Sequence, residues 1–121
     1  MAIHTDLPIY RTGVQLMSLA VDAQMNMPRG VKRTMGDKVA THCVEMLDLM
    51  ALANATKAEE RAKHIRQLLT HQRAVQVLLR VCFDRRDISM ALWAKATQLL
   101  DSIGKQANGW IRKTTNTGPA A

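Results

Sequence analysis

The fold of this chain is decided by residues 57–86, which read KAEERAKHIRQLLTHQRAVQVLLRVCFDRR. Apolar residues of the first half recur every three or four positions, at Ala58, Ala62, Ile65, Leu68 and Leu69. This spacing is typical of an amphipathic helix with one buried face. From residue 74 to residue 83 apolar side chains lie nearly all round the helix, so we expect that half to be covered on more than one side.

The composition predicts a small helical protein with a single domain, residues 1–121. A chain of 121 residues that is 47% hydrophobic can build one core without disulfides or metals. Two Trp, one Tyr and one Phe are its only aromatic residues, while the helix formers Leu, Ala and Met are common. The fold class we expect is all-α, an up-down-up-down antiparallel four-helix bundle. Its helices should span about 8–25, 29–53, 57–84 and 89–112, before a disordered tail at 114–121.

Local signals set these boundaries. Pro8 suits a first helical turn, and Pro28 disfavours helix at the residue before it. Thr56 and Glu59 have the spacing of a capping box, which predicts the start of the third helix. Ser89 is a candidate N-cap for the fourth.

Apolar spacing also predicts which face of each remaining helix is buried. In the first helix the expected face is Tyr10, Val14, Met17 and Val21. In the second it is Met35, Val39, Cys43, Met46 and Met50. In the fourth it is Trp93, Ala96, Leu100, Ile103, Ala107 and Trp110. Gly36, Gly104 and Gly109 lie inside helices, where we expect them to permit close packing.

The charge balance favours a polyanionic partner, either nucleic acid or an acidic protein surface. Seventeen Lys and Arg against ten Asp and Glu give a net charge of +7. One candidate anion site is at the start of the second helix, at Arg29, Lys32, Arg33 and Lys38. The other is a stripe along the third, at Lys63, Arg66, Arg73 and Arg80. Such residues contact phosphates without reading bases, and the alternative is a solvated charged face.

No pattern in the sequence indicates catalysis, a metal or another cofactor. A di-iron bundle needs paired Glu-x-x-His motifs, whereas His42 and Glu45 occur in the reverse order and Glu60 and His64 are spaced by four. There is also no Gly-rich phosphate loop. We therefore expect a non-enzymatic protein.

Several features predict a cytoplasmic protein without a membrane span. Cys43 and Cys82 each lie in an apolar run, where a free cysteine acts as a small core residue. The opening MAIHTDLPIY lacks the basic and apolar regions of a secretory signal. No apolar run is long enough to cross a bilayer.

The surplus apolar surface of the second and third helices predicts self-assembly, because soluble monomers rarely expose large apolar patches. Val77 and Val81 lie away from the expected core face. We expect a neighbouring subunit or helix to cover both, and we favour a homo-oligomer.

The chain resembles the accessory variability determinant (Avd) proteins of diversity-generating retroelements. The matching segments are Leu7-Pro8-Ile9-Tyr10, Met27-Pro28-Arg29, Leu78-Leu79-Arg80 with Ser89, Ile103-Gly104-Lys105 and Gly109-Trp110-Ile111. The resemblance implies a basic four-helix bundle that forms a ring-like homopentamer and binds both nucleic acid and the reverse transcriptase of the element during mutagenic cDNA synthesis. The family is also similar to the four-helix-bundle proteins of 23S rRNA intervening sequences. That second group suggests the alternative function, a structural oligomer or protein-interaction module with no polymerase partner.

Overall fold

A computed structural model describes residues 3–116 of the chain, and within that range the protein is helical with no strand. The all-α prediction is therefore confirmed. After a short 3-10 turn at His4–Asp6, the helices are α1 (Pro8–Asn26), α2 (Arg29–Val31), a π-helical segment (Lys32–Gly36), α3 (Asp37–Ala55), α4 (Ala58–Asp84) and α5 (Met90–Asn116).

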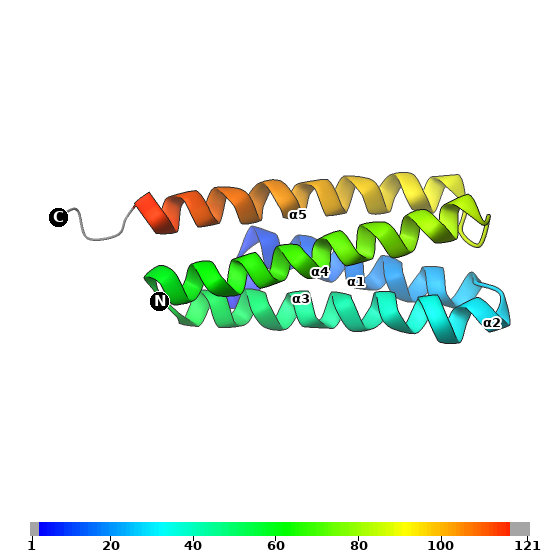
Figure 1. Ribbon diagram of the computed structural model, residues 1–121, viewed down its shortest axis with the longest axis horizontal. Coiled ribbons are helices and arrows are strands. Elements are labelled where there is room, and N and C mark those ends of the chain that lie inside the picture. The colour runs from blue at the N-terminus through cyan, green and yellow to red at the C-terminus, as the bar shows by residue number, and fades with distance from the viewer. Residues whose placement is uncertain (1–2, 117–121) are drawn as a thin grey trace.

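The long helices α1, α3, α4 and α5 lie lengthwise beside one another (Figure 1). The helix α3 packs against α4, α4 packs against α5, and α1 contacts both α3 and α5. One end of the molecule carries α2 and the turn between α4 and α5, and the turn between α3 and α4 lies at the other (Figure 1). Segments that are far apart in sequence are thereby placed side by side at each end.

The buried faces of α3 and α5 are those predicted. Val39, Cys43, Met46 and Met50 of α3 are buried, and Met35 packs against them. On α5, Ala96, Leu100, Ile103 and Ala107 are fully buried, and both tryptophans are partly buried at the edge of the core. Regular spacing of large apolar residues was a sufficient signal for these two helices.

The predicted face of α1 is right for Tyr10 and Met17, which pack against the core, and wrong for the two valines. Val14 and Val21 are 46% and 43% exposed, and the buried residues of α1 are Ile9, Gly13, Leu16, Ala20 and Ala23. A Cβ atom on Gly13 would lie only 2.9 Å from Cδ2 of Leu47. The helix α1 thus turns small residues inward because α3 approaches it closely, and a hydrophobicity pattern undervalues Gly and Ala.

Helix boundaries agree with the sequence at Pro8, Asp84 and Ser89, and differ at Thr56 and at the C-terminus. The Ser89 hydroxyl accepts a hydrogen bond from the backbone N–H of Leu92, as an N-cap should. The predicted capping box does not form, because the Thr56 hydroxyl donates to the carbonyl of Leu52, in the last turn of α3. At the C-terminus α5 continues to Asn116, so residues 114–116 are helical, and the rest of the predicted tail lies outside the described residues.

The predicted helix 29–53 is interrupted by the π-helical segment, in which the Asp37 N–H donates to the carbonyl of Lys32. Gln24 of α1 stabilises this segment, since its side-chain nitrogen donates to the same carbonyl at 3.1 Å and to Oδ1 of Asp37 at 2.5 Å. A Cβ atom on Gly36 would lie 2.8 Å from Cγ of Gln24, which confirms close packing there. Gly109 meets no neighbouring backbone, so the expectation for that residue was wrong.

Candidate nucleic-acid interface

The first predicted cluster gains two neighbours from another part of the chain. Arg29 lies in α2, and Lys32 and Arg33 follow it in the π-helical segment. Arg85 lies just beyond α4, and Arg85 and Val31 of α2 both line a cavity of about 510 Å³. We call Arg29, Lys32, Arg33, Arg85 and Arg86 the basic end. Cations are ordinary at a helix C-terminus, so the sequence alone gives Arg85 and Arg86 no special role.

Most cations of the basic end are not neutralised within residues 3–116. The Arg85 guanidinium lies 3.0 Å from Oδ2 of Asp87, whose side chain is only 7% exposed. Arg29, Lys32, Arg33 and Arg86 form no ion pair with the described residues. Lys38 is exposed near the start of α3 and is likewise unpaired there. Four of the five cations of the basic end are therefore without an ion-pair partner among the described residues.

The stripe on α4 is less available than its spacing suggested. Arg66 forms an ion pair with Glu59. Arg80 lies 3.1 Å from Oδ1 of Asp84, and its guanidinium sits 6.0 Å from the centre of the Trp93 ring. Two of the four predicted stripe residues are thus held by their own chain. Lys63 and Arg73 are exposed and form no ion pair within the described range.

The same face of α4 carries the apolar surface predicted to be covered. Val77 and Val81 are 63% and 40% exposed, so no helix of this chain within residues 3–116 covers them. Together with Arg80 and Trp93 they line an open groove of about 350 Å³ between α4 and α5. Arg73 and Arg80 are helical neighbours of Val77. A subunit that covered the valines would therefore also cover these arginines.

Two histidines form a pair between α3 and α4 that no spacing in the sequence indicates. The Nδ1 atoms of His42 and His71 lie 2.8 Å apart, so one ring donates a hydrogen bond to the other. Burial lowers the pKa of His42, and the charge of His71 lowers it further. The two residues lie 29 positions apart, and only the packing of α3 on α4 reveals the contact.

The described part of the chain shows no metal-ligand cluster, and both of its cysteines are buried. No three His, Cys, Asp or Glu side chains among residues 3–116 converge to hold a metal ion. Cys43 and Cys82 are buried and unbridged, and burial raises the pKa of the Cys43 thiol to about 12. Such a thiol is a core residue and not a nucleophile.

Comparisons with protein-family models, curated proteins and solved structures found no match to this chain. Within residues 3–116, no helix combines the length and the apolar character that a membrane span requires.

Proposed function

We propose that this protein is a non-catalytic accessory factor that binds the phosphate backbone of RNA or DNA through its basic end. The observation that carries this proposal is the group of unpaired cations at Arg29, Lys32, Arg33 and Arg86, on a chain with a net charge of +7. Clustered cations of this kind bind nucleic acid without base recognition and with strong salt dependence.

The resemblance to the Avd proteins supports a more specific proposal. In it the chain is an up-down-up-down antiparallel four-helix bundle that assembles into a ring-like homopentamer. The assembly binds the reverse transcriptase of a diversity-generating retroelement and supports mutagenic cDNA synthesis in the cytoplasm. Exposed Val77 and Val81 supply a surface on which a second subunit could pack.

The same exposed valines favour one alternative, a structural oligomer or protein-interaction module of the 23S rRNA intervening-sequence type. In that case the positive charge would meet only an acidic protein. A reverse transcriptase gene beside this one, with an imperfect repeat pair, would favour the retroelement function. The absence of both from the gene neighbourhood would favour the alternative.

A binding titration tests the proposal directly. Fluorescently labelled single-stranded RNA and DNA are titrated with the protein between about 50 and 200 mM salt, and anisotropy reports binding. We expect binding at low salt and a loss of roughly 300-fold or more across that range if at least six phosphates of the single strand are contacted. No binding to either nucleic acid at low salt would contradict the proposal.

A further inference from the structure

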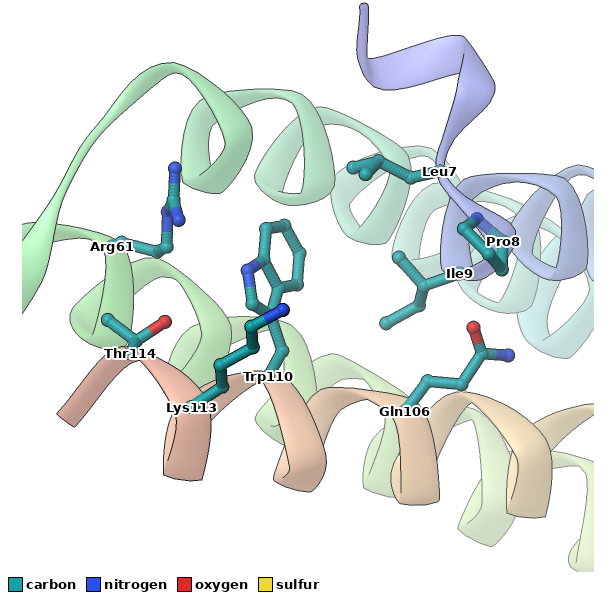
Figure 2. Close-up of a pocket in the computed structure, with 8 residues that line it drawn as sticks. All are labelled: Leu7, Pro8, Ile9, Arg61, Gln106, Trp110, Lys113 and Thr114. Carbon is teal, nitrogen blue, oxygen red and sulfur yellow. The ribbon is translucent and has the colours of Figure 1, made fainter. Parts of the chain in front are cut away.

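A second concave site lies at the end of the molecule opposite the basic end. It is a cavity of about 350 Å³ between the start of α1, the start of α4 and the last turns of α5 (Figure 2). This volume falls within the range of small-ligand sites, about 300 to 1,000 Å³. Neither the basic end nor the α4 stripe includes any of its lining residues.

The walls of this cavity suit a flat aromatic ring. Pro8 and Ile9 of α1 lie on one side, and the indole of Trp110 lies on the other, with an open space between them (Figure 2). Trp110 is only partly buried, and it lines the cavity. Aromatic side chains in such a position stack on nucleobases, because every base has a π-face.

The polar groups of the cavity suit an anion attached to that ring. The Arg61 guanidinium is 5.8 Å from the centre of the Trp110 ring. Its Nε donates to the carbonyl of Ala53 at 2.8 Å, and one terminal nitrogen donates to that of Asn54 at 3.4 Å. A guanidinium has five N–H groups, so these two bonds fix its position and leave three donors. Lys113 adds a second cation, and no carboxylate from the described residues lines the cavity.

One lining residue offers an oriented acceptor. The side-chain nitrogen of Gln106 donates to the hydroxyls of Thr12 at 3.1 Å and Ser102 at 3.0 Å. Both of its N–H groups are then used, and Figure 2 shows the amide oxygen directed into the cavity. That oxygen can accept a hydrogen bond from an N–H group on the edge of a base.

We propose that this cavity binds one unstacked base of a single-stranded nucleic acid. The base lies between Trp110 and the wall formed by Pro8 and Ile9, with its edge on Gln106. An adjoining phosphate lies at Arg61 and Lys113. The inference rests on the proposed function, because the strand must first bind the protein through its phosphates before one of its bases can enter the cavity. It adds a base contact at one end of the molecule to the phosphate contacts proposed for the basic end.

A single-tryptophan protein tests the inference. Trp93 stacks on Phe83 at the far end of α5, and Trp93→Phe keeps an aromatic ring there while leaving Trp110 as the only tryptophan. The variant is titrated with a short cytidine oligonucleotide and with an abasic oligonucleotide of the same length. We expect both to bind by anisotropy, and only the strand with bases to quench Trp110.

The outcomes separate this inference from the proposed function. Binding of both strands with no quenching, or with equal quenching by the abasic strand, overturns the inference and leaves backbone binding intact. No binding of either strand overturns both. Cytidine monophosphate is the third titrant. If it quenches Trp110 fluorescence at concentrations as low as the oligonucleotide does, the cavity is a site for free nucleotides. That result would overturn the proposal that the cavity binds a base of a strand.

Two substitutions at one position provide the matched control. In the otherwise unchanged chain, Trp110→Leu removes the stacking surface, and Trp110→Phe preserves it. We expect Trp110→Leu to weaken binding of the base-containing strand by about 5- to 100-fold and to leave the abasic strand unaffected. Trp110→Phe should restore most of the affinity. Equal reductions for both strands in Trp110→Leu, with native helicity by circular dichroism, would contradict a base contact.

Discussion

At the residue scale, the lowered pKa of the partly buried His42 predicts that the stability of this fold depends on pH. Burial and the nearby charges of His71 and Lys38 lower the pKa of His42, while Glu45 acts in the opposite direction. At pH values between the pKa of His42 in the folded protein and its ordinary pKa near 6.5, the unfolded chain binds more protons than the folded one. The stabilising contribution is complete above about pH 6.5 and decreases as the pH falls through the folded pKa.

We therefore expect the free energy of unfolding to decrease between about pH 7.5 and about pH 5.5. Urea denaturation at both values measures this change. His42→Gln should reduce the pH dependence, and His4→Gln, at the 3-10 turn, serves as the control substitution. If the free energy of unfolding of His42→Gln depends on pH as strongly as that of the unchanged protein, His42 is not the cause of the pH dependence.

A second prediction concerns the buried amide of Gln72. Its side chain is 6% exposed, and its nitrogen donates to the carbonyl of Leu100 at 2.9 Å, which links α4 to α5. Gly104 leaves room for it, since a Cβ atom there would lie 3.2 Å from that nitrogen. Gln72→Ala should lower the free energy of unfolding by about 1 to 3 kcal/mol, because it removes this hydrogen bond and leaves a void.

The control for Gln72 is the exposed Gln67 on the same helix. Gln67→Ala should change the free energy of unfolding by less than about 0.5 kcal/mol in the same denaturation experiment. Equal effects of the two substitutions would mean that the link between α4 and α5 contributes nothing to stability.

At the scale of the elements, the sequence was enough to predict where most helices lie. It was not enough to predict how the helices contact one another. The boundary at Ser89 and the buried faces of α3 and α5 depend on short-range spacing, and the structure confirms them. The inward face of α1 and the role of Thr56 depend on which helix lies alongside. No periodicity within one helix carries that information.

The π-helical segment gives a prediction at this scale. Gln24 donates to both the Lys32 carbonyl and Asp37, so Gln24→Ala removes the side-chain hydrogen bonds that the structure shows from α1 to this segment and to the start of α3. We expect faster amide hydrogen exchange at residues 32–37 and a decrease in stability of about 0.5 to 1.5 kcal/mol. The exposed Gln15 of the same helix is the control, and Gln15→Ala should leave exchange in that segment unchanged.

At the scale of the whole molecule, the exposed surface of α4 carries two predicted roles that compete. The valines predicted to form a subunit interface adjoin Arg73 and Arg80, which were predicted to bind nucleic acid. Because Arg80 already pairs with Asp84 and lies over Trp93, we assign this face to assembly. The basic end then remains as the stronger anion surface.

This assignment predicts the effect of charge on assembly. Val77→Asp with Val81→Asp places carboxylates in the apolar groove, and we expect the oligomer to dissociate into folded monomers. Val44, which is 45% exposed on α3, is the matched control, and Val44→Asp should preserve the assembly. Sedimentation velocity measures the mass. A wild-type protein that is monomeric at high concentration would contradict the assembly proposal.

The candidate site could be predicted from the sequence only in part. Arg29, Lys32 and Arg33 are adjacent in the chain, so their clustering was visible without a structure. Arg85 and Arg86 join them only because the turn between α1 and α2 and the turn between α4 and α5 lie at the same end (Figure 1). The cavity at Trp110 draws on three helices, so no single stretch of sequence could indicate it.

The salt dependence of binding tests the central claim, that the basic end binds phosphates, most directly. The slope of the logarithm of the binding constant against the logarithm of salt concentration changes by about 0.7 to 0.9 for each phosphate that the protein no longer neutralises. For Arg29→Ala, Lys32→Ala and Arg33→Ala combined, we predict a slope shallower by about 2 to 3 and weaker binding to RNA and DNA alike. The control is a second triple variant, Lys57→Ala, Lys95→Ala and Lys105→Ala, which removes three exposed cations outside the basic end. A slope that both triple variants change equally, or that the first leaves unchanged, would contradict the claim.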